Sequence, residues 1–380
     1  MSALVTLRVA RPAVAAFAAM GVLWGSFAAD LPDIKVMLDI DESRLGALMF
    51  MTPLAAVLAM LVAPVVGAAF GRVALPLACG LMCLGFALPG QTGSLWLFPL
   101  AMMACGAGTG LTDVLMNARV AALENARGLP LMNLCHAAYS FGYAGGAIAT
   151  GGLRSLGWAP AWVLGAMALL AAVVSLASLE RDGRIDGLRR PKGPGAAHLG
   201  WVPVIGGAMV LIAFLTENAA ENWSALHIEK SLGGSPADGA LGPAVMAITM
   251  GVARLFGQGL AARVPAVGLL TLGAAVSATG ALTAALATTP AMAYAGFIVM
   301  GIGSSVIAPT TFSLVGQMAT PEARARAVAR ATLLGYFGYF FGPPAIGFIA
   351  GSFGLRFAFV CAAVMLAGIP LLARVLKRQS

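Results

Sequence analysis

The chain has 380 residues, of which 60% are hydrophobic and only 10% are charged. Soluble domains carry roughly 25% charged residues, so this chain cannot cover a water-facing surface and is expected to be an integral membrane protein. Its net charge of +8 would suit a nucleic-acid surface, but the basic residues are scattered between apolar runs. They fit better as charges that set membrane orientation, so we expect the lipid bilayer, and no nucleic acid, among its partners.

Twelve apolar stretches are long enough to cross a bilayer, which takes about 20 residues each. In chain order they cover residues 9–30, 45–66, 73–90, 94–118, 131–153, 157–179, 200–226, 240–262, 265–288, 291–315, 327–350 and 355–376. The first is longer than the apolar part of a signal peptide and further spans follow it, so we count it as a span. The predicted fold class is an all-α membrane protein with twelve transmembrane helices.

The Lys and Arg residues predict the orientation of these spans. With an even number of spans both termini face one side, and seventeen of the 23 basic residues fall on that side against five on the other. Because basic loops stay in the cytoplasm, we expect cytoplasmic termini. The remaining basic residue, Arg254, lies inside the eighth span near its inner end, and we expect its side chain to reach out to the cytoplasm.

A polar linker and an internal repeat divide the sequence into halves. Residues 180–199 carry basic residues, Gly and Pro, which predicts a cytoplasmic linker between six-helix units at 1–179 and 200–380. CGAGTGLTDVLMN at 105–117 matches MGIGSSVIAPTTF at 300–312, and FGY at 141–143 returns at 337–339. Two matches at nearly the same offset indicate a duplicated unit. Parallel repeats of this kind bind substrate between their halves, which favours alternating access.

Four sequence segments resemble a known family: DVLMNARVAALE (113–124), LCHAAYSFGYAGG (134–146), ENAAENWS (217–224) and GVARLFGQGL (251–260). On these residues the chain resembles the major facilitator superfamily over nearly its whole length. More narrowly it resembles the bacterial branch with the MosC-like and YbjJ-like proteins, which is similar to the fucose-permease group. The chain departs from that pattern at Asn218, Glu221 and Asn222. The resemblance implies a multi-pass transporter of the bacterial inner membrane, with polyols, sugars or amino-cyclitol-like compounds as substrates.

Two glutamates stand one helical turn apart at the outer end of the seventh span. Counted from Trp201 at 1.5 Å per residue, Glu217 lies about 24 Å and Glu221 about 30 Å along the helix. Glu221 is therefore expected at the outer boundary, as a solvated carboxylate or an entrance for cations. Glu217 is expected to line a cavity, or else to serve as a structural hydrogen-bonding partner, because charges at membrane depth usually face the bundle interior.

A second pair of ionisable residues is expected at the inner side. Asp113 lies about 9 Å from the inner end of the fourth span, and His136 about 8 Å into the fifth. Their matched depth predicts an Asp–His pair that relays protons or contacts substrate, although a plain helix-to-helix hydrogen bond is the alternative. Asn117 follows Asp113 by one turn and extends the same face, either as packing or as part of the site.

The other candidate site residues are one carboxylate and three aromatic residues. Asp30 ends the first span and is expected to approach Glu217 at an outer gate, while Asp33 is expected in a solvated loop. Trp24, Tyr139 and Tyr336 either line the cavity or pack against neighbouring helices.

The function predicted from these features is secondary transport of a small polar solute, coupled to protons. The chain has no nucleotide motif, and its three scattered histidines supply no metal cluster or catalytic pair, so we expect no cofactor and no enzymatic activity. The alternatives are an exporter of cationic drug-like compounds or metabolites, and a non-transporting membrane sensor. We expect a monomer.

Overall fold

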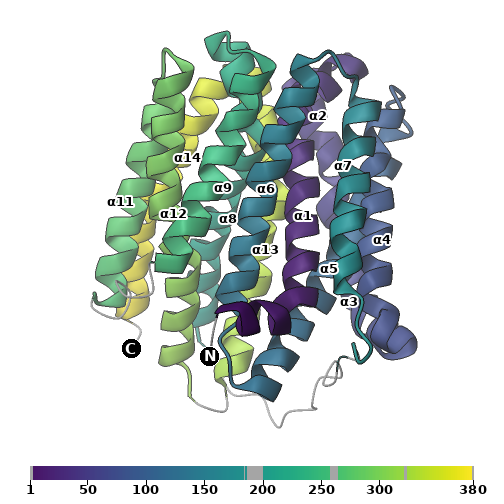
Figure 1. Ribbon diagram of the computed structural model, residues 1–380. Helices are drawn as coiled ribbons and strands as arrows, with labels where there is room; N and C mark the ends of the chain where they lie inside the picture. Colours follow the sequence, from purple (N-terminus) through teal and green to yellow (C-terminus); the bar gives the residue numbers. More distant parts are fainter. Residues whose placement is uncertain (1–2, 184, 186–199, 257–263, 321–322, 379–380) are drawn as a thin grey trace.

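The protein is a bundle of long helices, as its computed structural model shows (Figure 1). The structure describes residues 3–183, 185, 200–256, 264–320 and 323–378. In these ranges every element is helical. The start of α1 and the end of α14 lie on the same, lower side of Figure 1, which we call the terminal face; the opposite side is the far face.

The helices of the first half follow the predicted spans, with one division. They are α1 (Ala3–Leu38), α2 (Glu42–Met49), α3 (Met51–Phe70), α4 (Ala74–Ala87), α5 (Phe98–Arg127), α6 (Met132–Ser155) and α7 (Pro160–Ser175). Three short 3-10 turns join them: η1 (Gly71–Val73), η2 (Pro89–Gln91) and η3 (Leu176–Ser178). The second predicted span is formed by α2 and α3 together. Asp41 caps the start of α2, where its side chain accepts a hydrogen bond from the Arg44 amide.

The second half continues in the same way. Its helices are α8 (Val202–Leu226), α9 (Pro236–Phe256), α11 (Ala266–Ala285), α12 (Pro290–Met318), α13 (Arg324–Phe353) and α14 (Leu355–Lys377). A π-helical turn, η4 (His227–Ser231), extends α8. The seventh span therefore runs to residue 231, five residues beyond its predicted end. This extension places Glu221 deeper than the outer boundary at which it was expected.

The helix exteriors suit lipid. By length and composition alone, nine stretches among the described residues could cross a membrane. Many large apolar side chains on the outside are exposed, among them Leu61 at 72% and Phe348 at 63%. The twelve predicted spans each correspond to a described helix or helix pair, so the fold is that of an all-α membrane protein.

The two FGY segments have equivalent positions in the two halves. A Cβ atom added at Gly142 of α6 would lie 2.4 Å from the Ala18 carbonyl oxygen of α1. One added at Gly338 of α13 would lie 2.4 Å from the Leu211 carbonyl oxygen of α8. In each half, this glycine thus lets the fifth span of that half pack closely on its first span: α6 on α1, and α13 on α8. The sequence repeat therefore corresponds to a structural repeat.

The two halves meet mainly through α6 against α9 and α2 against α13. At the far face, Ser43 of α2 donates a 3.4 Å hydrogen bond to the Gly347 carbonyl of α13. Most of the predicted linker at 180–199 lies outside the described residues, so its boundaries stay a prediction.

Candidate functional site

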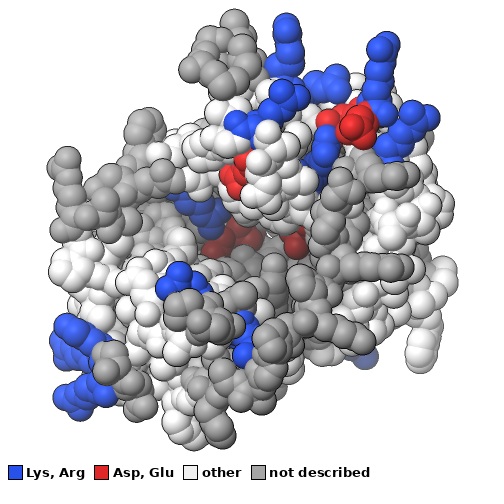
Figure 2. All heavy atoms as spheres, turned by 90° about the horizontal axis from the view of Figure 1, so that it is seen from below, with Lys and Arg blue, Asp and Glu red and all other residues white. Residues whose placement is uncertain are grey.

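A central cavity of about 890 Å³ lies between the two halves. Seen from the terminal face, the molecule is hollowed in the middle, and acidic side chains are visible inside the hollow (Figure 2). The far face is closed by the contacts between α6 and α9 and between α2 and α13. The structure is therefore a conformation open toward the terminal face.

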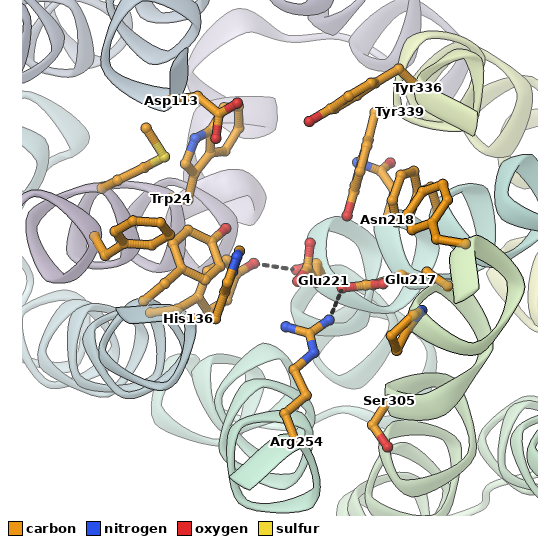
Figure 3. Close-up of a pocket in the computed structure, with 18 of the residues that line it drawn as sticks. Trp24, Asp113, His136, Glu217, Asn218, Glu221, Arg254, Ser305, Tyr336 and Tyr339 are labelled. Carbon is orange, nitrogen blue, oxygen red and sulfur yellow. Dashed lines mark hydrogen bonds and ion pairs between the residues drawn. The ribbon is translucent and has the colours of Figure 1, made fainter. Parts of the chain in front are cut away.

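Glu217 and Glu221 both line this cavity, on the inward face of α8 (Figure 3). Glu217 was expected to line a cavity, and it does. Glu221 was expected at the outer boundary, as a solvated carboxylate or an entrance for cations, and this position is wrong because its side chain lines the same cavity. The Glu217 side chain is 7% exposed and its Oε1 lies 3.3 Å from Nη2 of Arg254. The backbone carbonyl of Glu221 accepts a 3.2 Å hydrogen bond from the Tyr143 hydroxyl of α6. Glu217 thus pairs within the second half, whereas the backbone of Glu221 contacts the first half.

Arg254 is the basic residue of the site, and its predicted position is wrong. Its side chain does not reach out to the membrane surface; it lines the cavity from α9 and pairs with Glu217 (Figure 3). The pairing has a physical reason, because a buried carboxylate without a partner is strongly unfavourable. An Arg within an apolar span opposite a membrane-depth Glu was the signal that could have found this pair.

Asp113 and His136 line the same side of the cavity as Trp24, opposite α8 (Figure 3). The Asp113 carboxylate accepts a 3.1 Å hydrogen bond from the Asn117 side chain, whose amide also bonds the Asp113 carbonyl at 2.8 Å. The His136 ring packs edge-on against Phe17, with 5.0 Å between ring centres. Among the described residues no hydrogen bond joins Asp113 to His136, so the expected pair is not formed in this conformation.

Aromatic side chains form much of the remaining wall. Trp24, Tyr139 and Tyr336 line the cavity. Tyr143 and Tyr339 line it as well, although neither was a predicted site residue. They hold the same place in the two FGY segments, so the repeat itself was the missed signal.

Several neutral polar residues were also missed. They are spread over four helices of the two halves and offer hydroxyl and amide groups to the cavity: Thr52, Thr109, Asn218, Asn222 and Ser305. Single Ser, Thr and Asn residues are common in membrane helices as hydrogen-bonding contacts. The sequence therefore does not distinguish those that line a cavity from those that only join helices.

Asp30 does not line the cavity and does not approach Glu217. Its Oδ1 lies 3.7 Å from Nε of Arg154 on α6, and both side chains are 0% exposed. Asp33 is also not a loop residue, because α1 continues to Leu38 and the Asp33 carboxylate bonds Arg154 at 2.7 and 2.8 Å. Both predictions failed because α1 runs to Leu38, eight residues beyond the predicted end of its span at residue 30.

Glu124, one of the residues that carry the family resemblance, has a structural contact. Its Oε1 accepts hydrogen bonds from the backbone amides of Leu131 and Met132, at 2.6 and 2.8 Å. It thereby satisfies free N–H groups at the start of α6, the helix that carries His136 and Tyr139. Within the described residues, no group of three His, Cys, Asp or Glu side chains has the arrangement of a metal site.

A helical membrane bundle, with a central cavity that combines an apolar wall with charged and polar groups and opens to one face, is the architecture of a membrane transporter. The sequence model of the Major Facilitator Superfamily matches residues 205–380. The chain is 31% identical over 369 residues to an uncharacterized MFS-type transporter of Yersinia pestis, covering 96% of this chain and 94% of that protein. It is 26% identical over 345 residues to the membrane protein MosC of Rhizobium meliloti, covering 88% and 82%. The chain belongs to the major facilitator superfamily, in the MosC-like branch.

Solved structures show the same fold. The nucleoside transporter NupG superposes with a TM-score of 0.76 at 14% identity, covering 98% of this chain and 99% of that one. A D-xylose–proton symporter superposes with a TM-score of 0.73 at 15% identity, covering 98% and 97%. The predicted fold, twelve helices in two pseudo-symmetric halves, is thereby confirmed, and so is the resemblance on which it rested.

Proposed function

We propose that the protein is a secondary active transporter that moves a small polar solute across the bacterial inner membrane by alternating access, coupled to protons. The observation that carries the proposal is the charge of the cavity: Asp113, Glu217 and Glu221 face it, and among the lining residues that the structure describes Arg254 is the only guanidinium. Three carboxylates near one guanidinium leave negative charge that a proton or a cationic group of the solute would balance.

The Glu217–Arg254 pair is the proposed coupling site. When Glu217 takes up a proton it loses its charge, and the attraction that holds Arg254 at 3.3 Å is lost. Arg254 also lies beside Glu221, so it is free to turn to that carboxylate instead (Figure 3). The pair joins two helices of the second half, α8 and α9, and its loss would change how both face the cavity.

The solute is proposed to be a polyol, a sugar or an amino-cyclitol-like compound. The cavity offers aromatic faces from Trp24, Tyr139 and Tyr336 together with hydroxyl and amide groups. A binding site usually combines an apolar wall with a few polar groups that fix orientation. The structural relatives include transporters of a nucleoside and of D-xylose, which are polar solutes of similar size.

The terminal face is proposed to be cytoplasmic, with the linker at 180–199 on that side, separating halves at 1–179 and 200–380. The excess of Lys and Arg predicted for that side supports this orientation. Basic side chains are also visible around the hollow on the terminal face (Figure 2). The transporter is proposed to work as a monomer, because the cavity is enclosed by one chain.

The acidic cavity also favours a second candidate, an exporter of cationic compounds. Proteoliposomes with an imposed pH gradient separate the two. Gradient-driven accumulation of labelled myo-inositol or D-xylose supports the proposed solute class. Proton-driven movement of tetraphenylphosphonium with no movement of the neutral solutes would favour the exporter. Movement of neither class under any gradient would contradict transport of both kinds of compound.

A further inference from the structure

The far face is closed by an ionic cluster centred on Arg154, at the end of α6. The Arg154 side chain is 0% exposed although it carries a charge. Three carboxylates surround it: Asp30 and Asp33 from α1, and Glu229 from η4 at the end of α8. Arg154, Asp30 and Asp33 belong to the first half of the chain and Glu229 belongs to the second, so the cluster spans the junction of the halves.

All five N–H groups of the Arg154 guanidinium are used. Three stay within the first half: Nε and Nη2 bond Asp33 at 2.8 and 2.7 Å, and Nη1 bonds the Ala29 carbonyl at 2.7 Å. The other two cross to the second half, where Nη1 and Nη2 bond Glu229 at 2.7 and 2.9 Å. A guanidinium has five N–H donors, so none is left for a further acceptor.

Asp30 lies in the cluster but accepts no hydrogen bond from any residue that the structure describes. Its carboxylate lies 3.7 Å from Arg154 Nε, and both of its oxygens are buried without a hydrogen-bond donor there. A buried acceptor without a partner is unfavourable and calls for an explanation in each structure that has one. The explanation offered by the geometry is that its partner is engaged elsewhere in this conformation.

The apolar contact behind the cluster is small. The buried residues that join α1, α6 and α9 there are alanines except for Tyr143: Ala28, Ala29, Ala144, Ala147, Ala240, Ala244 and Ala247. Alanine buries little apolar area, so this seam separates at a lower cost than one of large interlocking side chains. The ionic contacts of the cluster therefore contribute a large part of the free energy that keeps the far face closed.

We propose that Arg154 is a latch that exchanges partners: it binds Glu229 when the far face is closed and Asp30 when that face is open. Separation of the halves removes Glu229 and frees two N–H groups. Asp30 has two free oxygens in the same half, already beside the guanidinium. The arginine therefore keeps two carboxylates in either state and is never left as an unpaired buried charge.

The geometry of η4 supports this role. The π-helical turn directs two consecutive side chains of opposite sign at the first half: Glu229 bonds Arg154, and Lys230 bonds Glu42 of α2. Single π-helical turns are frequent at functional sites. The Lys230 side chain is 55% exposed, so water screens that contact, whereas the Glu229 contact is largely buried. Glu229 is thus the stronger of the two closing contacts.

The test measures opening of the far face directly and needs no substrate. Ala244 is 0% exposed in the seam and does not line the cavity. An Ala244→Cys reporter, in a chain whose five native cysteines are replaced, reacts with a maleimide only when the seam opens. Alkylation rates are measured in nanodiscs. The proposal rests on the proposed function only in taking the far face as one that opens, so failed transport leaves this test unaffected.

The two carboxylates are expected to act in opposite directions. Glu229→Gln removes the closing contact and should raise the alkylation rate about tenfold, since truncating a buried charge pair has effects of that size or more. Asp30→Asn removes the partner of the open state and should lower the rate about threefold, a smaller effect because the closed state also loses some attraction. Asp33→Asn is the matched control, because Asp33 belongs to the same half as Arg154 and bonds it in both states. Its alkylation rate should stay within about twofold of the rate of the parent reporter.

Either of two results would overturn the latch. An unchanged rate in Glu229→Gln would mean that this contact does not hold the far face closed. An unchanged or higher rate in Asp30→Asn would mean that Asp30 is no partner of the open state. Should Glu229→Gln not fold, Glu229→Asp keeps the charge but shortens the reach, and its rate should lie between those of the parent and a tenfold increase.

Discussion

Arg254 of α9 lies 3.3 Å from the Glu217 carboxylate of α8, inside a cavity whose lining includes two further carboxylates, those of Asp113 and Glu221. This pairing explains why a span built for lipid contains a glutamate, since the inward face of α8 meets an arginine and not lipid. It also explains the arginine within the eighth span, which the sequence alone had assigned to the membrane surface.

Loss of Arg254 should strongly reduce proton-driven transport. Arg254→Gln leaves Glu217 buried without its cation, and such truncation costs about 2 kcal/mol or more, so we expect gradient-driven uptake to fall by about tenfold or more. Arg254→Lys should retain part of the activity. Arg44→Gln, at an exposed residue in the first turn of α2, is the control. Uptake at the parent rate in Arg254→Gln would remove the pair from the coupling site.

Asp113 and His136 should act independently. They share no hydrogen bond among the described residues, since Asp113 bonds Asn117 and His136 packs on Phe17. Effects of sites without shared partners usually add as free energies. The fractions of parent uptake that remain in Asp113→Asn and in His136→Gln should therefore multiply in the double variant. A double variant no worse than the poorer single one would restore the sequence-based hypothesis of a coupled pair.

The sequence predicted the helices better than it predicted the contacts of polar residues. Apolar length fixed the twelve spans, and the FGY repeat anticipated the matching glycine contacts at Gly142 and Gly338. The ends of the helices were harder to predict, because α1 and η4 continue through polar residues beyond the ends of their apolar runs. Those extra turns carry Asp33 and Glu229, so the cluster at Arg154 could not be predicted. Arg154 lies on α6 and its partners lie on α1 and η4, and no local sequence pattern relates these three elements.

The orientation proposed for the chain can be checked by labelling in whole cells. Ser155 at the far face and Arg127 at the terminal face are both exposed. Single cysteines at these positions, in a chain without the native five, should react from opposite sides: Ser155→Cys with an impermeant maleimide outside, Arg127→Cys only after permeabilisation. If Ser155→Cys does not react with the impermeant maleimide in intact cells, the termini are not cytoplasmic.

The hydroxyl of Tyr143 should help to hold the far face closed. It donates a 3.2 Å hydrogen bond to the Glu221 carbonyl across the junction of the halves. A hydrogen bond contributes about 1 kcal/mol, so Tyr143→Phe should raise alkylation of the Ala244→Cys reporter by up to about fivefold. Tyr294→Phe is the matched control, because its 2.9 Å bond to the Asp238 carbonyl stays within the second half. Equal rates in the two variants would show that the Tyr143 bond does not stabilise closure.

Glu217 and Glu221 should respond differently to neutralisation, although both line the cavity. Glu217→Gln removes the proposed proton-binding group and the ion pair with Arg254, but a neutral amide resembles the protonated carboxylate. Uptake driven by a pH gradient should then fall by about tenfold or more, while exchange of labelled for unlabelled solute at equal pH persists.

Glu221→Gln leaves the Glu217–Arg254 pair in place and keeps the backbone carbonyl that Tyr143 binds. Its effect should be milder and appear mainly as weaker apparent affinity, because one negative charge is lost from the cavity without loss of the proton site. The decisive measurement is gradient-driven uptake beside exchange for both variants, in the same proteoliposomes. If Glu221→Gln loses uptake but keeps exchange and Glu217→Gln does not, the coupling carboxylate is Glu221, and Arg254 serves it by turning from one glutamate to the other.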